Sequence, residues 1–223
     1  MSLLPEDSNT LRCEVIATAL AMNAAGLNVN TSGNVSARCT RGNRAGFLIT
    51  PTRMPYYQLV SDDIVFMQLA DGACFGQRLP SSEWRFHRDI YAHRPDVAAI
   101  VHCHSPHATA LACHGRGIPA FHYMVAVAGG SDVRCAHYAT FGTQALSDAA
   151  LTALHDRKAC LLSHHGLIAA EGSLERALAL AIEVENLART YQLACALGPP
   201  PLLSGEAMAE VLEKISAYGH HHP

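Results

Sequence analysis

The sequence contains few lysines and no cluster of charge of one sign. Its 223 residues include two lysines, Lys158 and Lys214, and the formal net charge is -3 with an isoelectric point near 6.5. The sequence has no run of basic residues and no acidic tail. Because nucleic-acid binding needs clustered positive charge, we expect no nucleic-acid partner.

Long apolar runs and an export signal are also missing. A helix that crosses a bilayer needs about 20 consecutive apolar residues, and the longest apolar runs here are far shorter. The segment MSLLPEDSNT carries two acids and a proline, unlike the basic and apolar start of a secretory signal. We therefore expect a soluble, cytoplasmic protein with no membrane partner. Since 49% of the residues are hydrophobic, we expect one domain over residues 1–223.

Cysteine pairs are lacking, whereas histidine is abundant. The eight cysteines stand singly without CxxC spacing, so we expect free thiols, most of them buried. Of the 14 histidines, His220 to His222 could be a tag or a natural tail, and the others all lie between residues 87 and 165. That clustering indicates metal or proton chemistry.

Hydrophobic periodicity predicts helices and short strands in mixed order. Strands are expected at 34–39, 46–51, 62–69, 73–76 and 97–105, with a strand pair or a strand and turn over 158–170. Helices are expected at 11–25, 79–95, 107–115, 174–197 (with Ser173 as N-cap) and 206–219. This order favours an α/β fold, a three-layer α/β/α sandwich around a mainly antiparallel mixed sheet.

Two histidines end the apolar strand expected at 97–105. Because side chains alternate along a strand, His102 and His104 point the same way and can reach one Zn²⁺ at about 2.0–2.1 Å. Two polar residues where a strand leaves the core would look the same, and the HxH pattern alone does not choose between these readings. A second apolar strand ends at His164 and His165, one of which could be a third ligand. Three protein ligands with an open position are typical of catalytic zinc.

Two further segments are suited to bind a phosphate group and to exchange a proton with a substrate. The loop LNVNTSGNVSAR is rich in Asn, Ser and Gly, whose exposed N–H groups suit an anion. Ser81 or Ser82 is the predicted N-cap of the 79–95 helix, a position that also favours phosphate, and Glu83 is expected in the first turn. Beside zinc, this carboxylate could be a ligand, a general base or both, although an ordinary first-turn acid is the alternative. Together these groups suit enediolate chemistry next to a carbonyl.

Several long segments carry a resemblance to a known family. They are GLNVNTSGNVSAR, LITPTRMPYYQL, LPSSEWRFH, VHCHS, GIPAFHYMVAVAGG, CAHYATFGT, LLSHHGLIA and LERALALAIEVENLA, with VLEKISAYG near the end. On these residues the chain resembles class II aldolases of the aldolase/adducin superfamily, and the L-fuculose-1-phosphate aldolases most of all. The resemblance extends over nearly the whole chain.

The resemblance implies a role for each matching residue. His102, His104 and His165 would bind one Zn²⁺ per subunit, while His164 would not be a ligand. Glu83 would be the catalytic acid and base, and would also ligate the metal when substrate is absent. The residues implied to bind phosphate are Gly33, Asn34, Thr52, Ser81 and Ser82. Tyr123 from a neighbouring subunit would protonate the aldehyde oxygen. Phe141 and Tyr218 would shape the aldehyde end of the site.

The implied reaction is the reversible cleavage of a ketose 1-phosphate to dihydroxyacetone phosphate and an aldehyde. The enzyme would be a homotetramer with active sites at subunit interfaces. The substrate would be L-fuculose 1-phosphate or a related deoxypentulose or methylthioribulose 1-phosphate, giving lactaldehyde, acetaldehyde or a methylthio analogue. No Schiff-base lysine is needed, and neither lysine lies in a matching motif.

Arg53 departs from the family pattern, in which glycine usually follows the threonine. It could pair with the phosphate or point to solvent, and either way it weakens the case for L-fuculose 1-phosphate itself. Rivals on the same fold are a methylthioribulose-1-phosphate dehydratase and a pentulose-phosphate 4-epimerase, which typically has aspartate in place of Glu83. A non-catalytic module like the adducin head is disfavoured, because such domains lack the metal ligands.

Overall fold

The fold is built on one mixed sheet. The computed structural model describes residues 4–218, apart from the side chain of Tyr218. Within them the strand order is β4-β3-β2-β1-β5-β8-β7-β6, antiparallel throughout except for the parallel pair β6 and β7. The strands are β1 (Asn34–Arg41), β2 (Arg44–Ile49), β3 (Val65–Gln68), β4 (Cys74–Phe75), β5 (Ala99–Cys103), β6 (Arg134–Ala136), β7 (Ala159–Leu162) and β8 (Gly166–Glu171).

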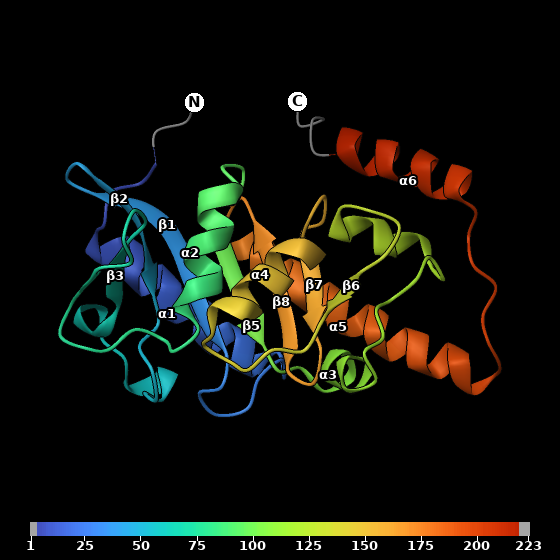
Figure 1. Ribbon diagram of the computed structural model, residues 1–223, viewed down its shortest axis with the longest axis horizontal. Helices are drawn as coiled ribbons and strands as arrows, with labels where there is room; N and C mark the ends of the chain where they lie inside the picture. Colours follow the sequence, from blue (N-terminus) through green and yellow to red (C-terminus); the bar gives the residue numbers. More distant parts are fainter. Residues whose placement is uncertain (1–3, 219–223) are drawn as a thin grey trace.

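Helices cover both faces of this sheet (Figure 1). Helices α1, α3 and α5 pack on one face, and α2 and α4 pack on the other. The predicted α/β/α sandwich around a mainly antiparallel sheet is therefore confirmed. The helices are α1 (Asn9–Ala24), α2 (Trp84–His93), α3 (Pro106–Cys113), α4 (Gln144–Ala153), α5 (Leu174–Ala196) and α6 (Gly205–Tyr218), with short 3-10 segments η1 (Tyr56–Gln58), η2 (Ser61–Asp63) and η3 (Tyr123–Ala128).

Alternation along the strands divides the core into two halves. On β5, Ala99, Val101 and Cys103 belong to the cluster beneath α1, α3 and α5, whereas Ile100 belongs to the cluster beneath α2 and α4. His102 therefore shares the side of Ile100. This alternation directs the imidazole towards the face that α2 covers.

The start of α2 differs from the prediction. The helix begins at Trp84 with Glu83 as its N-cap residue, so the expectation of Ser81 or Ser82 as N-cap and of Glu83 in the first turn is wrong. Ser81 Oγ instead accepts a hydrogen bond from the main-chain N–H of Glu83 at 3.3 Å. Within the described chain the Glu83 carboxylate makes no capping bond, so its side chain is free to turn towards β5.

The cysteines are free thiols as expected, but they are less buried than expected. Of the eight, all of which lie in the described range, Cys13, Cys74, Cys113 and Cys195 are exposed. The expectation that most are buried is therefore wrong. Three of these four lie on helices that also face solvent, and the fourth lies on the edge strand β4.

Helix α5 supports the segment that follows β5. It begins at the predicted cap, since Ser173 Oγ accepts a hydrogen bond from the N–H of Arg176. Further along, the Glu185 carboxylate accepts hydrogen bonds from the N–H groups of His107 and Ala108, both at 2.9 Å. Glu185 thus caps the N-terminus of α3 from another helix. Among residues 4–218, no helix is long and apolar enough to span a membrane.

Replacing Glu185 should therefore destabilise the fold. We expect Glu185→Ala to lower the free energy of unfolding by about 1–2 kcal/mol, because two N–H groups at the start of α3 lose a charged acceptor. Urea unfolding followed by circular dichroism measures this change. Glu183→Ala, on the same helix, is the matched control, since Glu183 accepts neither bond. Equal effects of the two substitutions would contradict the capping role.

Candidate metal site

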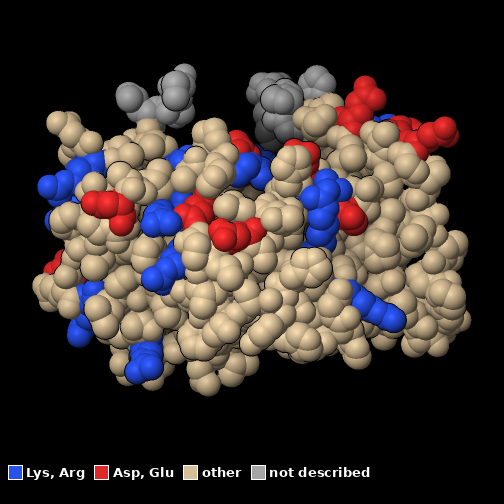
Figure 2. All heavy atoms as spheres, in the orientation of Figure 1, with Lys and Arg blue, Asp and Glu red and all other residues tan. Residues whose placement is uncertain are grey.

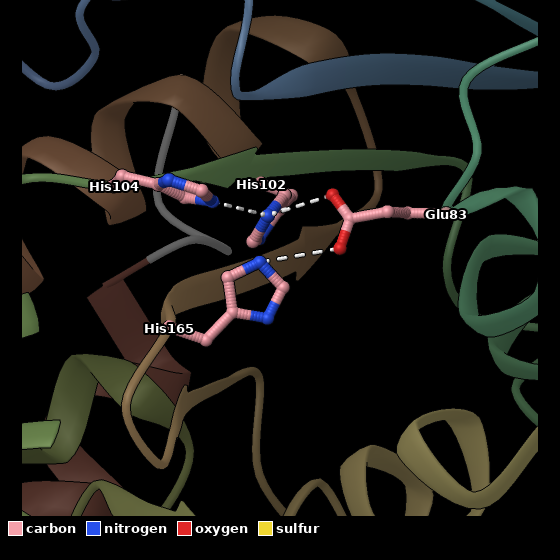
Figure 3. Close-up of side chains that lie close together, drawn as sticks. All are labelled: Glu83, His102, His104 and His165. Atoms are coloured by element: carbon pink, nitrogen blue, oxygen red, sulfur yellow. Dashed lines mark hydrogen bonds and ion pairs between the residues drawn. The ribbon is translucent and has the colours of Figure 1, made fainter. Parts of the chain in front are cut away.

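Four side chains converge where β5 ends, beside the β7–β8 turn and the start of α2 (Figure 3). One nitrogen or oxygen atom from each lies within 4.8 Å of the others. His102 Nε2 lies 3.1 Å from His104 Nε2 and 3.1 Å from Glu83 Oε2. Glu83 Oε1 lies 3.2 Å from His165 Nε2. The structure thus brings together the four predicted metal-binding residues, Glu83, His102, His104 and His165.

Backbone geometry separates the two adjacent histidines of the β7–β8 turn. His164 has a left-handed backbone with a φ of 56°, and its N–H donates to the carbonyl oxygen of Ala112. Its ring makes an edge contact with Tyr138, with centroids 5.9 Å apart. His165, the next residue, points its ring at Glu83 and His104 instead. The turn therefore sends one imidazole into the cluster and the other away from it.

The surroundings of His102 explain why a cation fits between these groups. Its Nδ1 lies 2.8 Å from the carbonyl oxygen of Leu167. Because a carbonyl oxygen is an acceptor, Nδ1 is the donor, and the lone pair of Nε2 in the neutral ring faces Glu83 and His104. Lone pairs at such separations repel one another unless positive charge lies among them. Glu83 Oε1 is also buried without a hydrogen-bond partner in the described chain, so this donor set fits a divalent metal ion.

Burial and charge set the protonation states in the cluster. Burial raises the pKa of Glu83, but its interactions with the neighbouring imidazoles of His102 and His165 outweigh burial and bring the pKa well below the ordinary value. Burial, and to a smaller extent the neighbouring imidazoles of His102 and His165, lowers the pKa of His104 to about 3. A carboxylate and a neutral imidazole are the forms that bind metal ions, so both groups are prepared as ligands.

A cleft of about 470 Å³ opens beside the cluster. Four predicted substrate-binding residues line it, namely Thr52, Arg53, Ser82 and Phe141. Three more lie next to it. Gly33 packs against the carbonyl oxygen of His102, Asn34 Nδ2 donates to Glu83 Oε2 at 3.0 Å, and Ser81 is buried under the start of α2.

One predicted residue, Tyr123, does not line this cleft, and the side chain of another is not described. Tyr123 is on η3, which contacts α5 and α6, and its side chain is 52% exposed outside the cleft of its own chain. The side chain of Tyr218 lies outside the described residues, as do His220 to His222.

The cleft also has lining residues that were not singled out from the sequence. Thr31 and Ser32 belong to the Asn- and Gly-rich loop predicted to suit an anion, so that loop does reach the site. Tyr138 and Ala139 also line the cleft, as does His164, which the sequence had marked only as a possible metal ligand. No local pattern marks Tyr138 and Ala139, because their position depends on how the chain before α4 packs against the β7–β8 turn.

The sequence matches a known protein family. The model of the Class II Aldolase and Adducin N-terminal domain family matches residues 13–192. The chain belongs to this family. The predicted family and the predicted enzyme class, an aldolase, are therefore confirmed.

Relatives agree over almost the full length. The chain is 50% identical over 216 residues to the 5-methylthioribulose-1-phosphate/5-deoxyribulose-1-phosphate aldolase of Rhodospirillum rubrum, covering 97% of this chain and 96% of that protein. It is 50% identical over 214 residues to the L-fuculose phosphate aldolase of Escherichia coli K12, covering 96% and 97%. A solved structure of L-fuculose 1-phosphate aldolase has a TM-score of 0.89 at 38% identity, covering 97% of this chain and all of that one.

The adjacent histidines His164 and His165 provide a matched test of whether the cluster binds metal. We expect His165→Ala to lose most of its bound metal on dialysis, because the site loses one of its converging nitrogens. His164→Ala should keep its metal, because that ring points away from the cluster. Elemental analysis of the dialysed proteins measures both. Equal metal content in the two variants would show that the cluster is not the site.

Proposed function

We propose that this protein is a zinc-dependent aldolase that reversibly cleaves a ketose 1-phosphate to dihydroxyacetone phosphate and an aldehyde. The observation that carries the proposal is the convergence of one carboxylate and three imidazoles at the edge of a cleft. His102, His104 and His165, with Glu83 when substrate is absent, would hold one Zn²⁺ per subunit. Three neutral nitrogens and an exchangeable fourth ligand favour zinc over the oxygen-seeking cations.

Glu83 is the proposed acid and base. When bound, the metal ion supplies Lewis acidity that polarises the ketose carbonyl. In condensation, the Glu83 carboxylate removes a proton from the third carbon, and Tyr123 of a neighbouring subunit donates a proton to the aldehyde oxygen as the carbon–carbon bond forms. Cleavage reverses both transfers. Although Glu83 is buried, its interactions with His102 and His165 hold its pKa well below the ordinary value, which keeps it ionised at neutral pH and ready to accept the proton.

The phosphate end of the substrate is proposed to lie at the start of α2 and the adjoining loops. Hydroxyl groups, main-chain N–H groups and a helix N-terminus are the donors that phosphate needs. Thr52 and Ser82 line the cleft, and Arg53 adds a positive charge to the same wall. The proposed phosphate set is Gly33, Asn34, Thr52, Ser81 and Ser82, with Arg53 as a further contact.

The aldehyde end is proposed to be apolar. Phe141 lines the cleft near Tyr138 and Ala139, and Tyr218 would complete this end. Such a wall suits the methyl or methylthio end of a deoxy sugar. L-fuculose 1-phosphate and the 5-deoxy- or 5-methylthioribulose 1-phosphates all carry such an end, which agrees with the names of both groups of relatives. The aldehyde released would be lactaldehyde, acetaldehyde or a methylthio analogue.

The assembly is proposed to be a homotetramer of one-domain chains, each of residues 1–223, with Tyr123 of one subunit completing the site of the next. A sugar phosphate is the proposed partner, and nucleic acid is not. On the face shown in Figure 2, charged side chains of both signs lie interspersed, mainly over its upper half. The cytoplasmic location stays a prediction.

A panel of ketose 1-phosphates tests the proposed function. We expect release of free dihydroxyacetone phosphate from at least one of them, loss of that activity with a chelator, and recovery with Zn²⁺. Glu83→Ala should retain metal on the three histidines but lose nearly all cleavage. A coupled assay detects dihydroxyacetone phosphate, and mass spectrometry identifies the products. An exclusively epimerised product would indicate the 4-epimerase, and a dehydrated product with an intact carbon chain would indicate the dehydratase.

Arg53 provides a second test, because its backbone conformation lowers the stability of the fold whereas its charge favours binding of the phosphate. Its φ of 60° lies in the left-handed region, which glycine adopts without the strain of a side chain. We expect Arg53→Gly to leave the free energy of unfolding unchanged or higher, yet to raise KM for the ketose phosphate by roughly tenfold. Arg53→Lys, which keeps the charge, should raise KM less. An unchanged KM in Arg53→Gly would mean that Arg53 points to solvent.

A further inference from the structure

A chain of buried polar groups leads from the interior of the fold to Glu83. Tyr91 OH and Ser36 Oγ are 2.7 Å apart, and Ser36 Oγ lies 2.7 Å from His87 Nδ1. His87 Nε2 lies 2.5 Å from Asn34 Oδ1, and Asn34 Nδ2 donates to Glu83 Oε2 at 3.0 Å. The chain links α2 to β1. Its inner members are sealed from water, with exposed fractions of 0% for Ser36, His87 and Tyr91 and 1% for Asn34.

Chemistry determines the direction of every bond in this chain. The ionised Glu83 carboxylate is an acceptor, so the NH₂ group of Asn34 must face it, and the carbonyl oxygen of Asn34 must face His87. His87 Nε2 is then the donor. Burial lowers the pKa of His87 to about 3, so the ring is neutral and its Nδ1 is an acceptor. The Ser36 hydroxyl consequently donates to His87, and Tyr91 donates to Ser36.

The imidazole at the centre of the chain cannot readily turn. It stacks on Phe86 with ring centroids 4.6 Å apart and lies nearly parallel to Phe47 at 6.4 Å. A ring held flat between aromatic side chains presents its two nitrogens in fixed directions. The amide of Asn34 is fixed in turn, because a flip would place its oxygen against the Glu83 carboxylate.

The two oxygens of Glu83 are consequently not equivalent. Oε2 accepts the Asn34 bond, whereas Oε1 is buried, lies 3.2 Å from His165 Nε2 and accepts no hydrogen bond in the described chain. A hydrogen bond to an ionised oxygen lowers its basicity, and the oxygen without one is the better proton acceptor.

We propose that His87 is a positioning residue that orients the Asn34 amide, which pins Glu83 Oε2 and leaves Oε1 as the oxygen that exchanges the proton with substrate. This inference rests on the proposed role of Glu83 as acid and base. A purely structural role would not need this arrangement, since apolar side chains would fill the same interior at no cost in unsatisfied polar groups. The chain ends at the one carboxylate of the cluster.

Three substitutions separate positioning from packing. His87→Leu removes both nitrogens, and we expect kcat to fall by roughly 10- to 100-fold, with bound metal near the wild-type value. In His87→Gln, one amide can donate to Asn34 and accept from Ser36, so most of kcat should return. Tyr91→Phe removes the outermost donor and leaves the His87–Asn34–Glu83 segment complete. It should cost stability with little loss of kcat.

Thermal unfolding of each variant completes the comparison. If kcat falls in proportion to stability, whichever member of the chain is changed, the residues are structural and the proposal is overturned. Wild-type kcat in a folded His87→Leu variant also overturns it.

The ring nitrogens of His87 can be observed without any assay of activity. Long-range ¹H–¹⁵N correlation spectra of the ¹⁵N-histidine-labelled wild-type enzyme, assigned with His87→Gln, should show a neutral His87 with its proton on Nε2. A proton on Nδ1, or a doubly protonated ring at neutral pH, would refute the direction of the chain. This measurement stands even if His87→Leu does not fold. If wild-type enzyme releases no dihydroxyacetone phosphate, the proposed function fails while the spectrum still tests the chain.

Discussion

A carboxylate surrounded by imidazole lone pairs is the constraint on which this structure depends. Glu83 is 4% exposed, and its oxygens lie 3.1 and 3.2 Å from nitrogens of His102 and His165. Removing a charged group from water costs several kcal/mol, and a metal ion held at the centre of the cluster would offset that cost. The helix start, the β7–β8 turn and the interior hydrogen bonds are all arranged around this requirement.

Different elements of the fold orient the side chains of the cluster. The pleat of β5 turns His102 to the side of α2, and the Leu167 carbonyl on β8 fixes which nitrogen of that ring faces the centre. Helix α2 begins one residue after Glu83, so a short rigid segment carries the carboxylate. His102 lies on a paired strand, and the other three residues directly adjoin the end of β5, the start of β8 and the start of α2, so regular elements hold their relative positions.

Local patterns were sufficient for the regular parts of the site and insufficient for the rest. Period-two alternation placed His102 and His104 together because β5 is a regular, fully buried strand. The choice of His165 over His164 came from family resemblance, since it depends on a left-handed turn and a contact with Ala112. The start of α2 was misplaced because Glu83 turns away from its helix to meet residues far along the chain. The buried chain through His87 was invisible because it exists only where α2 packs on β1.

The residues of the cluster lie far apart in the sequence, and this separation links metal binding to the stability of the whole fold. Glu83 and His165 are distant along the chain and become neighbours only after β5, β8 and α2 have assembled. An ion bound there has affinity for the folded chain and little for the unfolded one, so mass action couples its concentration to the folding equilibrium. Ion supply would thus govern the lifetime of the protein as well as its turnover.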